Sequence, residues 1–359
     1  MFSKKTYQIL TILLFVQIGL VSFLSKLPNF VENFYATGIY TYISSFLRKL
    51  LGWIPFSVGD IIYFLLIFLT VRFIIRFFRH KQKKILLLQF FAGVSIFYFF
   101  FYFFWGFNYS RLPVSKSLPL TKIETGKFDI DKLKNLTEHL LFKSIQLQLQ
   151  LTKHDSLPVI VPYKRDTILQ LTQVGYAHLS HEFPQFEYIP ASLKKSLFSV
   201  PLTYMGFSGY FNPLTGEAQV NYLIPKINLP MTCSHEVAHQ LGIASESEAN
   251  FIGFLAANFH PDLYFQYSAN LLALRYALRD IYQYNPTLYQ SYIKQLPKGI
   301  LKNFRENAIF WEKYKNPTEP LFKSFYHNYL KYNQHTDGIK NYGKMVYLLI
   351  AYQEEYVLE

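Results

Sequence analysis

The stretch CSHEVAHQLGIASESEANFIGFLAA, residues 233–257, decides how the chain is interpreted. Its first half contains the pattern HEVAH at 235–239. Residues four apart on an α-helix share a face and lie about 6 Å apart, so His235 and His239 can direct two imidazole nitrogens at one Zn²⁺. Glu236 points aside from that pair and can accept a proton from a water that the metal activates. The stretch therefore predicts a zinc site with Glu236 as general base.

The second half of the stretch must supply a third protein ligand. Gly242 is placed to end the first helix in a left-handed conformation. Ser245 is expected to cap a second helix, with Glu248 as the other half of a capping box. Glu246 then begins that helix beside the turn, facing the two histidines, and Asn250 follows on the same face, where it can orient a ligand. We expect Glu246 to be the third ligand, and Glu248 is the alternative.

Other metal-ligating residue types near the motif are less suited to the site. The extended pattern HExxHxxGxxH would need a third histidine where this chain has Ser245, and serine is a poor zinc ligand. Cys233 lies two residues before His235 and points away from the ligand face, so we expect a buried thiol. His178 and His181 are expected to lie on a solvated helix face.

Three apolar stretches in the first third of the chain are long enough to cross a bilayer: 7–24, 56–78 and 85–107. No small-x-small cleavage site follows the first, which favours an uncleaved anchor. Residues 1–106 hold +9 of the net charge of +13, so the basic surplus flanks the spans and does not form a nucleic-acid-binding stripe. We divide the chain into a membrane region, 1–107, and a domain, 108–359.

The basic residues also predict an orientation. Lys4, Lys5 and the Lys/Arg-rich segment 72–84 should both be cytoplasmic, and two crossings separate them. The third crossing then delivers residues 108–359 to the extracytoplasmic side. Segment 30–53 either lies along the outer surface as an amphipathic helix or packs as an ordinary loop helix.

The domain is expected to be mainly helical. Helical spacing of apolar residues appears at 129–151 and 165–183, and from 262 to the end, where prolines and Gly338 interrupt it. Alternating runs around a Pro-Gly turn predict a β-hairpin at 202–224. Its residues 217–222 are either an edge strand that binds a peptide or purely structural. An oxyanion-stabilising group is also needed, and Tyr342 and His335 are candidates.

A family resemblance can now be stated. Residues 246–250, ESEAN, resemble the ExxA(D/N) element of gluzincin proteases, including CAAX-processing membrane enzymes. The arrangement is more similar to an uncharacterised bacterial family with N-terminal membrane spans, an SGYFNPLTGEAQVN-like hairpin, HExxHQxG and ExEANFxGFLA; the similarity reaches DGIKNYGKMVYLLIAY, 337–352. In gluzincins the first Glu binds zinc and the Asp/Asn supports it. The gap from His239 to Glu246 is shorter here, which keeps the choice of Glu246 or Glu248 open.

These observations predict an α+β, mainly α protein: three N-terminal transmembrane helices, then a zincin-like, gluzincin-type domain with a small antiparallel sheet or hairpin. The expected function is a multi-pass bacterial membrane peptidase with one Zn²⁺ per chain and peptide or protein substrates, and no nucleic-acid partner. The alternative is a catalytically inactive zincin-fold binding or signalling module, although Glu236, which metal binding does not need, argues against it. An intramembrane protease is disfavoured because 225–257 contains no span.

Overall fold

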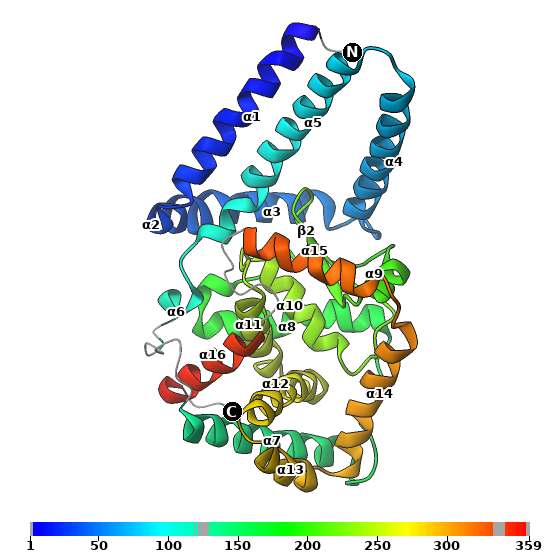
Figure 1. Ribbon diagram of the computed structural model, residues 1–359. Coiled ribbons are helices and arrows are strands. Elements are labelled where there is room, and N and C mark those ends of the chain that lie inside the picture. The colour runs from blue at the N-terminus through cyan, green and yellow to red at the C-terminus, as the bar shows by residue number, and fades with distance from the viewer. Residues whose placement is uncertain (1–2, 119, 121–128, 333–341, 357–359) are drawn as a thin grey trace.

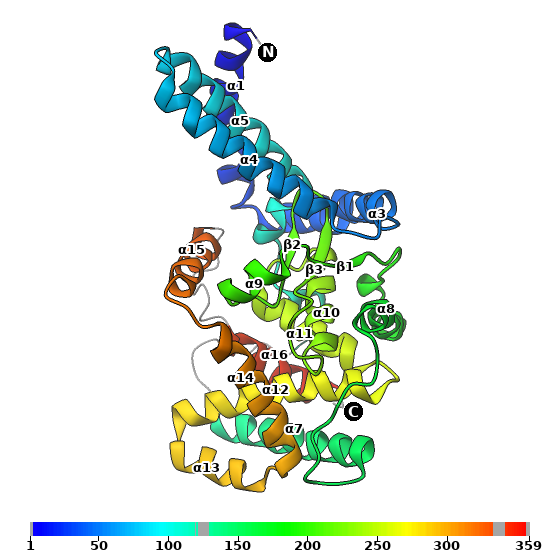
Figure 2. The same cartoon turned by 90° about the vertical axis from the view of Figure 1, so that its right-hand side faces the viewer.

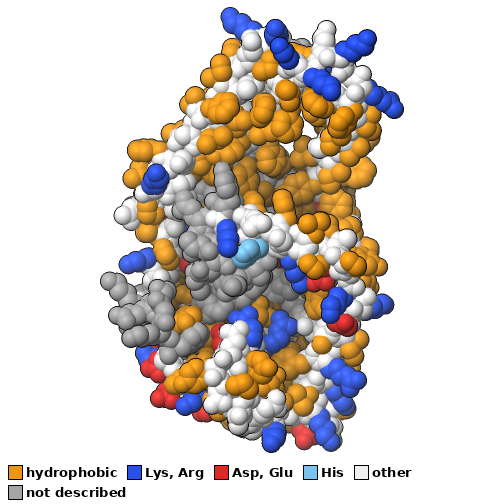
Figure 3. Space-filling model, viewed as in Figure 1, with side chains coloured by type: hydrophobic (Ala, Val, Ile, Leu, Met, Phe, Trp, Pro, Cys, Tyr) orange, Lys and Arg blue, Asp and Glu red, His pale blue; other side chains and the backbone are white. Residues whose placement is uncertain are grey.

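Three long helices form one end of the molecule in the computed structural model, which describes residues 3–118, 120, 129–332 and 342–356 (Figure 1). They are α1 (Lys4–Leu24), α4 (Val58–Arg79) and α5 (Lys83–Phe104), and each is long and apolar enough to cross a membrane. The N-terminus of α1 and the turn from α4 to α5 lie at the same end, away from the rest of the chain. Figure 3 shows apolar side chains along this bundle and Lys and Arg side chains at its far end. The expected apolar helices are therefore confirmed.

A helical segment lies across the other end of the bundle. It consists of α2 (Pro28–Phe30), the π-helix η1 (Val31–Ile39) and α3 (Tyr40–Leu51). One face of α3 is buried through Tyr40, Ser44 and Arg48, and the hydroxyls of Tyr40 and Ser44 donate to the carbonyl of Gln240. The opposite face exposes Tyr42, Phe46 and Leu50, with Trp53 just beyond the helix. The segment thus packs on the domain and still presents an apolar face.

The remaining elements form a mainly helical body. They are η2 (Gly106–Ser110), α6 (Val114–Ser117), α7 (Ile130–Thr152), α8 (Arg165–Glu182), η3 (Pro184–Phe186), α9 (Ser199–Met205), α10 (Leu229–Gln240), α11 (Glu246–Asn258), α12 (Leu263–Tyr284), α13 (Pro286–Gln295), α14 (Lys298–Tyr314), α15 (Glu319–Tyr332) and α16 (Tyr342–Glu355). The helices expected at 129–151 and 165–183 are confirmed, as are the breaks at Pro286, Pro297 and Pro317/Pro320; Gly338 lies outside the described residues.

The core of this body surrounds α11. Residues 249–257 are all buried, which is the pattern of a helix enclosed on every side. Its neighbours are α8, α10, α12 and α16, and apolar side chains from all of them join one cluster. A second, smaller cluster joins Tyr35, Tyr40 and Trp105 to Ala244, so contacts cross the position 107/108.

The sheet has three short strands, β1 (Leu193–Lys195), β2 (Gly209–Asn212) and β3 (Glu217–Val220), in the order β1-β3-β2. β2 and β3 form the expected antiparallel hairpin, and Gly216 in its turn has a φ of +64°. β1 pairs in parallel with β3, so the sheet is mixed. Of the two alternatives for 217–222, the edge strand is excluded, because β1 pairs with β3 on the side opposite β2. In the hairpin it is β2, not β3, that lies at an edge of the sheet. Residues 202–205, which were expected in the hairpin, belong to α9.

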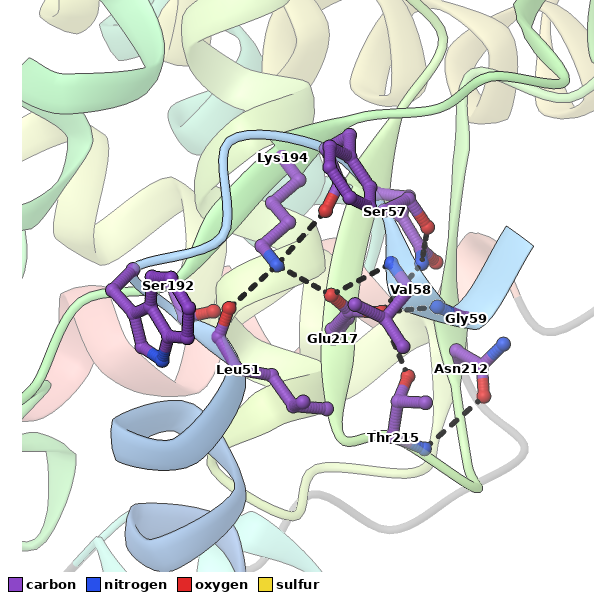
Figure 4. Close-up of polar contacts among 12 residues, drawn as sticks. Leu51, Ser57, Val58, Gly59, Ser192, Lys194, Asn212, Thr215 and Glu217 are labelled. Atoms are coloured by element: carbon purple, nitrogen blue, oxygen red, sulfur yellow. Dashed lines mark hydrogen bonds and ion pairs between the residues drawn. The ribbon is translucent and has the colours of Figure 1, made fainter. Parts of the chain in front are cut away.

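A buried ion pair joins the sheet to the segment that precedes α4 (Figure 4). The Nζ of Lys194 lies 2.6 Å from Oε1 of Glu217, and both side chains are buried. The same Nζ donates to the carbonyls of Leu51 and Phe56, at 2.8 and 3.1 Å. The ammonium group thus links β1, β3 and the loop that precedes α4.

The first turn of α4 is held by the same carboxylate. The backbone N–H groups of Val58 and Gly59 donate to Oε1 and Oε2 of Glu217 at 3.2 and 2.5 Å. A carboxylate at a helix N-terminus satisfies unpaired N–H groups and interacts favourably with the helix dipole. Asp60 extends the junction, because its Oδ2 accepts from the N–H of Leu197 at 2.6 Å and its Oδ1 from the Tyr210 hydroxyl. The body is therefore fixed to α4 by polar contacts inside the protein.

Lys194→Ala is expected to lower the free energy of unfolding by about 3–5 kcal/mol, because it leaves the Glu217 carboxylate buried without its cation. Lys195→Ala, which removes the exposed neighbouring lysine, should change it by less than about 0.5 kcal/mol. Denaturation of the two purified variants in detergent measures the difference. Equal stabilities would contradict a structural role for the buried pair.

Candidate metal centre

A tight turn joins the two helices of the motif. Gly242 has a φ of +86°, its N–H donates to the carbonyl of His239, and the N–H of Ile243 donates to the carbonyl of Ala238. This is a Schellman arrangement, so the expected left-handed end of the first helix is confirmed. A Cβ on Gly242 would lie 2.9 Å from the Tyr40 ring, so α3 packs directly on the turn.

Close packing brings the first turn of α11 back to the histidines of α10. A Cβ on Gly253 would lie 2.8 Å from the backbone nitrogen of His235, so only glycine allows this approach without a shift. Ala249 is fully buried in the same contact, as expected for a small residue between helices. Glu246, the first residue of α11, thereby faces His235 and His239.

Three donor groups converge at this point. The Nε2 atoms of His235 and His239 lie 3.1 Å apart. Oε2 of Glu246 is 3.3 Å from Nε2 of His235, and its Oε1 is 3.5 Å from Nε2 of His239. Among the described residues this is the only group of three or more His, Cys, Asp or Glu side chains close enough to hold a metal ion.

The donor set fits zinc. Ligand atoms about 2.0–2.1 Å from a tetrahedral zinc are separated by about 3.3–3.4 Å, which the three measured separations bracket. The Nδ1 of His239 lies 2.7 Å from the carbonyl of Ile243, a contact that orients the ring and leaves Nε2 for the metal side. The ring of Trp105 meets that of His239 edge-on, 6.3 Å between centroids. His235, His239 and Glu246 are thus brought together, and their role as ligands stays a prediction.

The electrostatics of the group suit a cation. Burial alone would raise the pKa of Glu246, but His239 and His235 hold it well below its usual range. Burial alone would lower the pKa of His239, and the Glu246 carboxylate reverses this and raises it to about 9. The carboxylate is therefore ionised and directed at two imidazole nitrogens.

Glu236 is buried beside this group. Burial raises its pKa to about 7, and the neighbouring histidines only partly oppose this. Its Oε2 has no hydrogen-bond partner among the residues that the structure describes. A Cβ on Gly209 would collide with Oε1 of Glu236 and lie 2.7 Å from the carbonyl of Gln219, so the start of β2 runs against the carboxylate.

The alternative ligand, Glu248, is directed elsewhere. Its Oε1 accepts a hydrogen bond of 3.0 Å from the backbone N–H of Val114 at the start of α6. Ser245 precedes α11 as expected, but its side chain makes no cap hydrogen bond and instead lies 3.0 Å from the hydroxyl of Ser247. The expected capping box is wrong, because the Ser245 side chain makes no cap hydrogen bond and the Glu248 carboxylate accepts from Val114 in another element.

Four other predicted positions can be located. Asn250 is buried one turn after Glu246, and its Nδ2 has no partner within the described part of the chain. Cys233 is a buried free thiol whose pKa is raised by burial, as expected. His178 and His181 lie exposed on α8, also as expected.

A tyrosine that the sequence did not single out completes the group. The hydroxyl of Tyr326, on α15, donates to Oε1 of Glu246. Eighty residues separate the two positions, and no motif spacing connects them. The expected candidates cannot be compared with Tyr326, because His335 and the side chain of Tyr342 lie outside the described residues.

Gln240, directly after the motif, was also missed. Its Nε2 donates to the carbonyls of Ser192 and Gly216, at 2.9 and 2.8 Å, and its Oε1 accepts from the hydroxyl of Tyr188 at 2.6 Å. All three partners belong to segments around the sheet, so this amide fixes the end of α10 against it. The sequence shows a glutamine directly after HExxH, but it does not predict which groups that side chain contacts.

Comparison with curated proteins and with solved structures finds no match to this chain. The family model described as "Protein of unknown function (DUF3810)" matches residues 35–350, a range that includes α3, two of the long apolar helices and the whole candidate metal centre, and the chain therefore belongs to that family.

Proposed function

We propose that the protein is a zinc-dependent peptidase anchored in a membrane by α1, α4 and α5. The observation that carries this proposal is the convergence of His235, His239 and Glu246 beside a buried, incompletely paired Glu236. Two histidines and a glutamate are a common set of catalytic zinc ligands, and they leave a fourth position open. A structural site would not need the buried carboxylate of Glu236.

Each residue has a separate task. His235, His239 and Glu246 hold the ion, and the Ile243 carbonyl fixes the ring of His239. Bound Zn²⁺ supplies a Lewis acid that polarises a carbonyl oxygen and lowers the pKa of water. Glu236 accepts the proton of the attacking water and returns it to the leaving amine; its pKa near 7 suits both steps.

Two further elements support peptide chemistry. β2 is an edge strand whose first residue, Gly209, abuts Glu236, so an extended peptide that pairs with β2 passes the metal centre. The hydroxyl of Tyr326 lies against Glu246 and is positioned to donate to a developing oxyanion. These assignments replace 217–222 as the peptide-binding strand and add Tyr326 to the candidates for oxyanion stabilisation.

Purified protein is expected to contain about one zinc per chain, and removing the zinc with a chelator should abolish hydrolysis of a peptide library. Restoring one equivalent of Zn²⁺ should restore the activity. Elemental analysis and mass spectrometry of the library measure both. Full activity in metal-free protein would refute the proposal, and bound zinc without cleavage would favour the alternative of an inactive binding module.

We also propose that the body faces the extracytoplasmic side, since both basic clusters lie at the opposite end of the bundle. The only cysteine, Cys233, is buried, so one introduced cysteine reports on one position. In right-side-out spheroplasts, a membrane-impermeant maleimide should label Phe142→Cys on α7. It should label Gln82→Cys, between α4 and α5, only after lysis. The reverse pattern would invert the topology.

A further inference from the structure

The outer face of α15 is apolar and exposed. Leu321 and Phe325, one turn apart, are largely exposed, and Phe322 beside them is partly so. Further along the same helix are the buried Leu330 and the Tyr326 hydroxyl that donates to Glu246. One helix thus carries both a contact to the metal centre and exposed apolar side chains.

Two further elements also expose apolar side chains. The segment leading through α9 exposes Leu197, Val200 and Tyr204, and the last two are one turn apart. On α3 the exposed apolar residues are Tyr42, Phe46 and Leu50, each one turn from the next, followed by Trp53. We call these exposed side chains of α3, α9 and α15 the membrane face.

The position of these elements indicates what covers them. Figures 1 and 2 show α3, α9 and α15 at the end of the body nearest the three long apolar helices. The long helices expose apolar side chains along their length, and α3 exposes an apolar stripe of its own. Exposed apolar stripes are unusual on a soluble surface, whereas helices that lie in a membrane interface carry them on the lipid side.

Basic side chains accompany the stripes. Lys49 on α3 and Lys195 on β1 are exposed, and Lys323 on α15 pairs with Glu319 one turn away. Lysines beside an apolar stripe can reach phosphate groups while their stems cover apolar surface. A second protein would not need to contact both α3 and α15, whereas a bilayer entered by α4 and α5 lies along both.

We propose that the membrane face rests in the lipid interface of the bilayer that the three long helices span, with α15 between the lipid and the metal centre. This rests on the membrane anchoring in the proposed function and adds a substrate class: peptide segments presented at the bilayer surface by a lipid anchor or a transmembrane helix. Such segments reach β2 and Glu236 from the side that α15 covers.

Site-specific fluorescence tests the membrane face on the full chain. Phe325→Cys and Phe46→Cys, labelled with an environment-sensitive dye, are reconstituted into vesicles of phosphatidylcholine and phosphatidylglycerol. The matched control is Phe142→Cys on α7, because Phe142 and Phe325 are 68% and 74% exposed and α7 lies at the far end of the body. Nitroxide-bearing lipids should quench the dye at 325 and 46 at least several-fold more than at 142.

Other outcomes overturn the inference. Quenching at 325 by aqueous iodide but not by lipid nitroxide, as at 142, would place α15 in water. Shielding of 325 from both quenchers, with a 325–325 crosslink, would show that a second copy covers the face. Zinc content and peptide cleavage of the same samples separate the two proposals: lipid quenching without zinc or cleavage would refute the peptidase and leave the membrane face standing.

Discussion

Glu236→Gln is expected to lower the rate of peptide hydrolysis by about 10²–10⁴-fold, the usual contribution of a general acid–base residue, while the protein retains its zinc. The amide keeps the shape of the buried side chain but cannot accept a proton from the attacking water. Because Glu236 is not among the three converging donors, its replacement should leave zinc stoichiometry near one per chain. Cleavage rate and metal content measured on one preparation give the comparison.

Glu248→Gln is the matched control for this change. The two glutamates are close in sequence, but the Glu248 carboxylate accepts from Val114 at the start of α6. Cleavage by this variant should stay within a few-fold of the unmodified chain. Unchanged cleavage in Glu236→Gln would remove Glu236 from the mechanism, and equal losses in both variants would point to damage of the fold.

Glu246→Ala is expected to weaken zinc binding by more than about 100-fold, since even residues that only orient a ligand cost about 10–100-fold when replaced. The change removes a carboxylate that lies within 3.5 Å of both imidazoles and leaves two of the three converging donors, too few for a stable site. It also deprives Tyr326 of its acceptor. Titration with a competing zinc chelator measures the affinity.

Glu248→Ala should bind zinc with nearly unchanged affinity. A larger loss in Glu248→Ala than in Glu246→Ala would reverse the assignment and require α11 to rotate relative to α10. Equal and small losses would mean that the two histidines bind the ion with a ligand from the undescribed segments.

Local signals in the sequence predicted part of this fold well. The long apolar runs set the three long helices, because length and hydropathy decide whether a helix can cross a bilayer. Gly242 predicted the turn between α10 and α11 because its left-handed φ strongly favours glycine. β1 was missed because three residues carry no readable period, and its pairing partner lies more than twenty residues away.

The same division holds for the candidate site. Helical spacing predicted that His235, His239 and Glu246 converge. In the structure the Nε2 atoms of the two histidines lie within 3.5 Å of each other, and each lies within 3.5 Å of a carboxylate oxygen of Glu246. The capping box failed because the Ser245 hydroxyl lies against its neighbour Ser247, and because Glu248 accepts from Val114, a distant partner that a local pattern cannot reveal. Tyr326 could not be predicted for a related reason. Its contact with Glu246 depends on how α12, α13 and α14 fold between the two residues, and no local pattern determines that.

The Glu217–Lys194 junction has a consequence for how the protein encounters other molecules. A domain on a flexible tether samples a volume set by the length of its linker and turns all of its faces towards the surroundings. Here the carboxylate of Glu217 holds the first turn of α4, and Tyr40 packs on the turn of the metal centre. With the long helices anchored in a membrane as proposed, the body turns and diffuses together with its anchor. The protein then meets other anchored molecules by lateral diffusion in the membrane, with its metal centre at a constant height above the bilayer and in a fixed orientation. Which segments it meets is therefore set by their distance from the membrane rather than by their affinity.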